Sequence, residues 1–274
     1  MIVERIDAAA DDLRTQWQST APIRHLVLDD LLPEELASQV IAALPPLDDL
    51  LLRSSLRERK RVGIEVDRYE PIIREMLYAF QQPEIVDAVQ RVTGIEGLVA
   101  DPSLYAAGLS VMAQDDFLNP HIDNSHDGDQ KLYRALNLLY YVTPDWVESN
   151  GGNLELWDRK VTSSTTVLSA FNRLVVMETT PTSWHSVKKV SVDRTRCCVS
   201  NYFFAAVSPT GHDYRHITTF TGRPEEKLKR ATLLVLDRGI LSTAAKVMPS
   251  LVTRTKHRIK TDADAVSTAG EADA

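Results

Sequence analysis

The sequence lacks the features of a disulfide-stapled, membrane-spanning or nucleic-acid-binding protein. Its 274 residues include two cysteines, and these are the neighbours Cys197 and Cys198, which cannot bridge separate parts of a fold. It contains no run of about 18 apolar residues, so we expect no membrane span. Acidic residues outnumber basic ones, 38 against 31, and we therefore expect no nucleic-acid partner.

The first residues, MIVERIDAAADDL, carry acidic side chains where a secretory signal would have a basic start followed by an apolar segment. Together with the low cysteine content, this predicts a cytoplasmic protein. Apolar residues make up 43% of the chain and charged residues 25%, which is typical of a globular protein with a substantial core.

Two kinds of sequence pattern divide the chain. Residues 1–100 are predicted to be mainly helical, with a strand near residues 25–30 and helices that begin at Pro33, Pro71 and Pro83. In residues 101–207, short runs such as ALNLLYYVT, RLVVME and CCVSNYFF alternate with Asn, Gly, Asp and Pro, which indicates an antiparallel sandwich or barrel. We predict one domain over residues 1–250, mainly β with flanking helices, including a C-terminal helical part over 208–250. Residues 251–274 are predicted to be a disordered tail.

The segment FLNPHIDNSHDGD holds the first candidate metal ligands. His121 and Asp123 are two residues apart, so in an extended chain both side chains leave the same face. The best third ligand is His185 in the strand-like run SWHSVKKV. Two histidines and one carboxylate form the facial triad typical of non-haem Fe(II) oxygenases, whereas a structural metal site is commonly closed by four ligands.

An arginine follows in the same region. Arg196 begins the apolar run that continues to Phe204, and an arginine inside a sheet is costly unless an anion pairs with it. The distal carboxylate of 2-oxoglutarate would be such an anion, since it matches the guanidinium fork. Arg194 shares the strand parity of Arg196 and is the competing candidate.

Taken in order, the H-x-D pair, the Gly151-Gly152 turn before NLELW, the WHSV run and the downstream arginine resemble the 2-oxoglutarate- and Fe(II)-dependent oxygenases. The resemblance covers roughly residues 101–204 and is strongest to the prolyl 4-hydroxylase-like branch. It implies a double-stranded β-helix (jelly-roll, cupin-like) core, O₂ as a co-substrate and ascorbate as an optional addition. It also implies Fe(II) on His121, Asp123 and His185, with 2-oxoglutarate on Arg196. Asn137 and Tyr141 are expected beside that co-substrate.

The expected activity is hydroxylation of an unactivated C–H bond in a polar small molecule or an amino-acid residue, with release of succinate and CO₂. A prolyl-type hydroxylase acting on a peptide or protein is the alternative. It is weakened because the chain lacks the tyrosine commonly found shortly before H-x-D in collagen-type enzymes. Two further alternatives are a zinc-dependent hydrolase that uses the same three ligands and a non-catalytic jelly-roll binding module. The sequence fixes neither the substrate nor the oligomeric state.

Overall fold

The computed structural model describes residues 1–101 and 103–236 of the chain. Its centre is a 13-stranded sheet in the order β1-β10-β7-β12-β5-β3-β6-β11-β8-β9, with β2 added to β3, β4 to β12 and β13 to β6. Neighbouring strands run antiparallel. The strands are β1 (His25–Leu28), β2 (Leu51–Ser54), β3 (Glu58–Gly63), β4 (Leu98–Val99), β5 (Gly108–Met112), β6 (Phe117–Ile122), β7 (Tyr133–Tyr141), β8 (Leu154–Trp157), β9 (Ser164–Val167), β10 (Arg173–Glu178), β11 (His185–Val187), β12 (Arg196–Ala205) and β13 (Thr219–Phe220).

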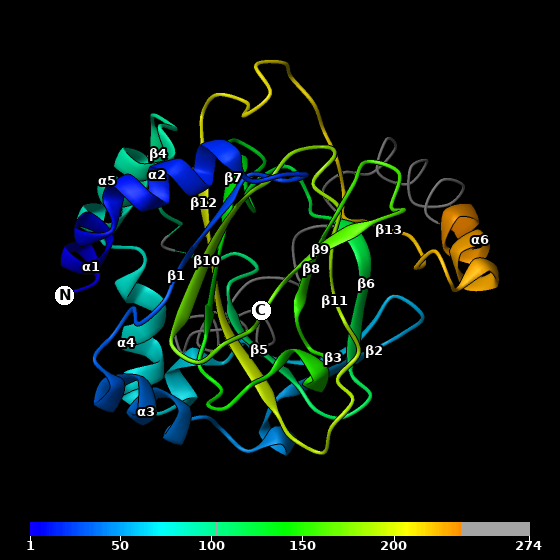
Figure 1. The fold of residues 1–274 in the computed structure, drawn as a ribbon, viewed down its shortest axis with the longest axis horizontal. Coiled ribbons are helices and arrows are strands. Elements are labelled where there is room, and N and C mark those ends of the chain that lie inside the picture. Colours follow the sequence, from blue (N-terminus) through cyan, green and yellow to red (C-terminus); the bar gives the residue numbers. More distant parts are fainter. Residues whose placement is uncertain (102, 237–274) are drawn as a thin grey trace, which may run out of the picture.

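The sheet is curled, so that the half containing β1, β10, β7, β12 and β5 lies opposite the half containing β6, β11, β8 and β9 (Figure 1). Helices α1 (Ile2–Ala8), α2 (Ala10–Ser19), α3 (Glu34–Ala42), α4 (Pro71–Ala79) and α5 (Pro83–Thr93) lie on the outer side of the first half. Helix α6 (Lys227–Leu236) lies at the other side of the molecule (Figure 1). This arrangement confirms the predicted mainly β fold with flanking helices.

Alternate residues of β7 show how the core is divided. Leu136, Leu138 and Tyr140 pack into the large cluster that includes the helices. Tyr141 packs with side chains from β8, β9 and β10 between the two halves of the sheet, and Leu139 packs against that cluster. Because successive side chains of a strand point to opposite faces, one face of β7 supports the helices and the other lines the interior.

The helix starts at Pro71 and Pro83 are as predicted, since both prolines occupy the first turn of their helices. Helix α5 ends at Gly94, whose φ of +70° is the left-handed conformation that favours glycine. The hairpin of β2 and β3 was not predicted, because the sequence LLRSSLRERKRVG is too charged to resemble a buried strand. Strand β3 is nevertheless paired with β5 and β6, so pairing on both sides stabilises it.

No helix in residues 1–101 and 103–236 is long and apolar enough to cross a membrane. The predicted C-terminal helix is described as far as Leu236. The predicted tail over residues 251–274 lies outside the described residues.

Candidate metal centre

The structure brings His121, Asp123 and His185 together. His121 on β6 and His185 on β11 are direct partners in the sheet register, and their ring centroids are 4.1 Å apart. Asp123 follows the end of β6. Its Oδ1 lies 3.6 Å from His121 Nε2, and its Oδ2 lies 3.6 Å from His185 Nε2. One ligand atom from each residue therefore lies within 4.8 Å of the other two, which a single metal ion can bridge.

Both histidines are held with the same ring nitrogen free. His121 Nδ1 lies 3.0 Å from the carbonyl oxygen of Asn119, and His185 Nδ1 lies 3.0 Å from that of Ser183. A carbonyl oxygen only accepts hydrogen bonds, so Nδ1 carries the proton and Nε2 keeps its lone pair for a metal. Burial, followed by the nearby charge of His121, lowers the pKa of His185 to about 4, which keeps that imidazole neutral near pH 7.

The carboxylate of Asp123 is kept ionised by its neighbours. Burial alone would raise the pKa of Asp123, but Arg134 and the two histidines hold it well below its usual range. Arg134 Nη1 lies 3.4 Å from Asp123 Oδ2, and the Arg134 side chain is almost completely buried. Sequence reasoning missed Arg134, although an arginine within the apolar run YRALNLLYY is as unusual as Arg196. Two imidazoles and one carboxylate fit a divalent transition metal.

Arg196 is the first residue of β12 and is 3% exposed. Its guanidinium carbon lies 4.6 Å from the centroid of the Tyr141 ring, and Nη1 lies 4.0 Å from Met112 Sδ. Its Nε has no hydrogen-bond partner, and no ion pair with a carboxylate of the described residues satisfies the charge. A buried cation without an anion is costly, so this environment fits a ligand that brings a carboxylate.

Arg194 has different surroundings. It is exposed and donates hydrogen bonds to the main-chain carbonyls of Pro144 and Asp145, at 2.7 and 3.0 Å. Its charge is solvated and its donors are already used, so the geometry favours Arg196 over Arg194 as the anion-binding residue.

The structure separates the two other residues expected at the co-substrate. Tyr141 lies beside Arg196, fully buried, and its hydroxyl has no hydrogen-bond partner. Asn137, on the same face of β7, lies instead against Asp123, to whose Oδ2 its amide donates a 2.7 Å hydrogen bond. Strand β7 thus reaches both the metal ligands and the arginine.

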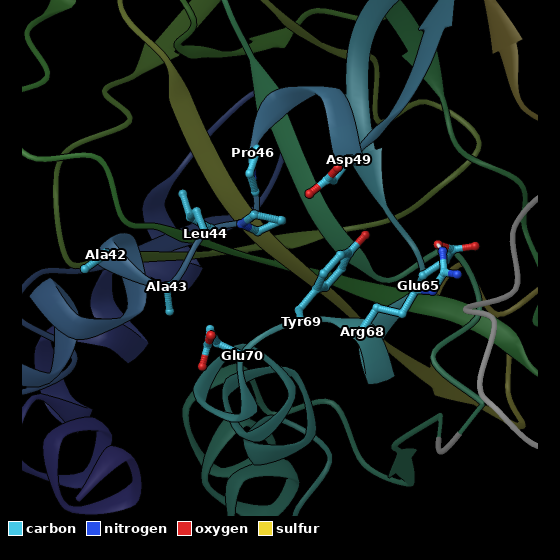
Figure 2. Close-up of a pocket in the computed structure, with 10 residues that line it drawn as sticks. Ala42, Ala43, Leu44, Pro46, Asp49, Glu65, Arg68, Tyr69 and Glu70 are labelled. Atoms are coloured by element: carbon cyan, nitrogen blue, oxygen red, sulfur yellow. Dashed lines mark hydrogen bonds and ion pairs between the residues drawn. The ribbon is translucent and has the colours of Figure 1, made fainter.

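A surface cavity of about 530 Å³ lies apart from this centre, between the end of α3 and the start of α4 (Figure 2). Tyr69 lies centrally among its labelled side chains, with Asp49, Glu65 and Glu70 around it (Figure 2). Its lining includes none of the residues discussed above, and we do not assign it to the metal centre.

Comparison with known proteins agrees with this geometry. A family model described as the 2OG-Fe(II) oxygenase superfamily matches residues 107–204, a range that contains every candidate site residue predicted from the sequence. Prolyl 3-hydroxylase OGFOD1 of Mus musculus is 30% identical over 87 residues, which are 29% of this chain and 15% of that protein. The chain therefore matches only a small part of this curated relative.

Two solved structures show the same fold. A prolyl-4-hydroxylase from Pseudomonas putida aligns with a TM-score of 0.51 and 16% identity, over 75% of this chain and 99% of that one. A prolyl 4-hydroxylase structure from Phytophthora capsici aligns with a TM-score of 0.54 and 17% identity, over 92% of this chain and 82% of that one. The predicted jelly-roll core is confirmed. The match over residues 107–204 is to the 2OG-Fe(II) oxygenase superfamily, as the resemblance implied, and members of this superfamily are non-haem iron dioxygenases that use Fe(II), 2-oxoglutarate and O₂.

Proposed function

We propose that this protein is a 2-oxoglutarate- and Fe(II)-dependent hydroxylase in which His121, Asp123 and His185 hold the iron and Arg196 holds the co-substrate. The observation that carries the proposal is the buried Arg196 guanidinium without an anionic partner, in the same β-fold as a His-Asp-His cluster. A zinc hydrolase would use the three ligands but has no evident need for this cation. A non-catalytic binding module would need neither the three metal-ligating side chains nor this cation.

The chain's own residues supply ligation, orientation and charge. The Nε2 atoms of the two histidines and a carboxylate oxygen of Asp123 would hold the metal. Arg196, beside the Tyr141 ring, would anchor the distal carboxylate of 2-oxoglutarate. With iron bound, O₂ would be the oxidant, one oxygen atom entering succinate as 2-oxoglutarate loses CO₂ and the other hydroxylating a C–H bond.

For the substrate, we propose a polar small molecule or an amino-acid residue. Polar groups flank the metal centre on β3, where Glu58 and Lys60 form an ion pair of 3.2 Å. Burial opposes ionisation of Glu58, yet Lys60 and Arg53 lower its pKa, and Glu58 is close enough to His121 to interact with it electrostatically. Charged groups held this near the ligands favour a substrate with hydrogen-bonding groups.

A prolyl residue of a peptide or protein is the second candidate substrate. The observation that favours it is the similarity to a protein named prolyl 3-hydroxylase, over 87 residues at 30% identity. A panel of polar metabolites and proline-containing peptides, scored by succinate release, separates the two candidates.

The direct test is anaerobic addition of Fe(II) and 2-oxoglutarate to the purified protein. We expect a weak visible charge-transfer band that is absent in Asp123→Ala, because loss of the carboxylate removes one of three metal ligands. Failure of the folded wild-type protein to give the band would refute the proposal. Metal analysis after air-free purification tests the zinc alternative. Ligand binding that is indifferent to Asp123→Ala would instead indicate a binding module.

A further inference from the structure

Two side chains of β7 contact the same oxygen of Asp123, Asn137 through a hydrogen bond and Arg134 as an ion pair. Asn137 Nδ2 lies 2.7 Å from Asp123 Oδ2, and Arg134 Nη1 lies 3.4 Å from that oxygen. Both donors are almost completely buried, Asn137 at 2% exposed and Arg134 at 1%. Asp123 itself lies in the connection that follows β6, so these contacts from a separate strand orient it.

The orientation of the Asn137 amide is fixed by a second hydrogen bond. Thr179, directly after β10, donates from its hydroxyl to Asn137 Oδ1 at 3.2 Å. Thr179 is buried and its main-chain N–H donates to the carbonyl of Ala135 at 2.9 Å, which holds the threonine in place. Because the amide oxygen is engaged by Thr179, the NH₂ group is the side that faces Asp123.

Arg134 is fixed in a comparable way. Its guanidinium carbon lies 4.0 Å from the centroid of the Tyr202 ring, and its Nη2 donates to Asn124 Oδ1 at 2.9 Å. Stacking on the Tyr202 ring and the hydrogen bond to Asn124 hold the cation beside Asp123. Together the two contacts hold Oδ2 of Asp123, which also lies 3.6 Å from His185 Nε2, while Oδ1 lies 3.6 Å from His121 Nε2.

We propose that Asn137 is a positioning residue that, with Arg134, fixes the orientation of the Asp123 carboxylate between His121 and His185. The inference rests on the proposed function, because it concerns the same metal centre, and it assigns Asn137 to the metal ligand instead of to 2-oxoglutarate. Without the amide, the carboxylate would lose one of the two contacts from β7 that oppose rotation about its Cβ–Cγ bond. Partners that orient metal ligands typically contribute about 10- to 100-fold in metal affinity.

The test measures binding of Mn(II) and Co(II) to the purified protein in the absence of substrate. We expect Asn137→Leu to weaken Mn(II) binding by about 10- to 100-fold and to change the visible absorption of bound Co(II), because the coordination of Asp123 changes. Asn137→Asp, which keeps the side-chain size but places a carboxylate against a carboxylate, should weaken binding at least as much. If Asn137→Leu does not fold, the Mn(II) affinity and the Co(II) spectrum of Asn137→Asp test the inference.

The matched control is Asn201→Leu. Asn201 is also a fully buried strand asparagine, on β12, but it accepts a hydrogen bond from Gln81 on the helical side of the sheet. Its substitution should leave Mn(II) affinity and the Co(II) spectrum unchanged. Wild-type affinity and spectrum in both Asn137 variants would overturn the inference, as would an equal loss in Asn201→Leu. If the wild-type protein binds no divalent metal, it is the proposed function that fails.

Discussion

Replacing Arg196 with methionine should move the stability of the ligand-free protein and the affinity for 2-oxoglutarate in opposite directions. Methionine keeps a long, unbranched side chain but removes the charge. Arg196 is 3% exposed and its Nε has no hydrogen-bond partner, so removing the guanidinium relieves the cost of a buried unpaired group. We expect the free energy of unfolding to stay unchanged or to rise, by up to about 3 kcal/mol.

The same substitution should strongly weaken the binding of 2-oxoglutarate. Truncating one partner of a buried charge pair costs about 2–5 kcal/mol, which corresponds to roughly a 30- to 4,000-fold increase in the Kd for 2-oxoglutarate. Calorimetric titration of the Mn(II)-loaded protein measures this affinity, and urea unfolding of the metal-free protein measures the stability.

Arg194→Met is the matched control, since it removes an arginine two residues away whose partners are the exposed carbonyls of Pro144 and Asp145. Its Kd for 2-oxoglutarate should stay within about a factor of two of the wild-type value. The reasoning would be refuted by an Arg196→Met protein that is less stable and binds 2-oxoglutarate normally, since Arg196 would then be a structural residue. If Arg194→Met loses more affinity for 2-oxoglutarate than Arg196→Met does, then Arg194 is the residue that binds the carboxylate.

Three further outcomes are expected. Because burial lowers the pKa of His185 to about 4, the metal-free protein should lose up to about 3 kcal/mol of stability as the pH falls from 6.5 through 4. Urea titrations at several pH values should show a weaker dependence of stability on pH in His185→Gln. An unchanged dependence would contradict the lowered pKa of His185. Mn(II) at 100 times its Kd should raise the free energy of unfolding by about 2.7 kcal/mol, an effect that Asp123→Ala should abolish. Gly151→Ala should be far more destabilising than Gly94→Ala, because an added Cβ at Gly151 would lie 1.9 Å from the Lys189 carbonyl oxygen. An added Cβ at Gly94 meets nothing within 4 Å, so Gly94→Ala has only the conformational cost of about 1–2 kcal/mol.

The strands that build the core were predictable because they are apolar and short. The cluster of His121, Asp123 and His185 was predictable because these residue types and their spacing suit a facial triad. The β2–β3 hairpin was not predictable in the same way. In β3, Arg59 and Arg61 lie near Asp116, at 3.4 and 3.3 Å, while Glu58 and Lys60 pair with each other. A strand of alternating charged residues is stable here because those partners and two neighbouring strands are supplied by the tertiary fold.

The hydrogen-bond partner of Asn137 also could not be predicted from the sequence. The spacing of β7 predicts that Asn137 and Tyr141 share a face, and they do, but which groups that face meets depends on the register of the neighbouring strands. Asn137 is opposite Met177 of β10 and Tyr202 of β12, and this register places its amide beside Asp123 instead of Arg196. A shift of one residue would have turned it towards the helices.

The two buried arginines show why the same physical rule leads to different conclusions. An arginine inside a sheet requires an anion, and this holds for Arg134 as well as for Arg196. For Arg134 the anion is within the chain, since Asp123 lies 3.4 Å away and Tyr202 stacks on the cation. For Arg196 the neighbours are an aromatic ring and a thioether, so its anion has to arrive with a ligand. The sequence can identify both arginines, but only the positions of the acidic side chains support the proposals that Arg134 orients Asp123 and that Arg196 binds the co-substrate.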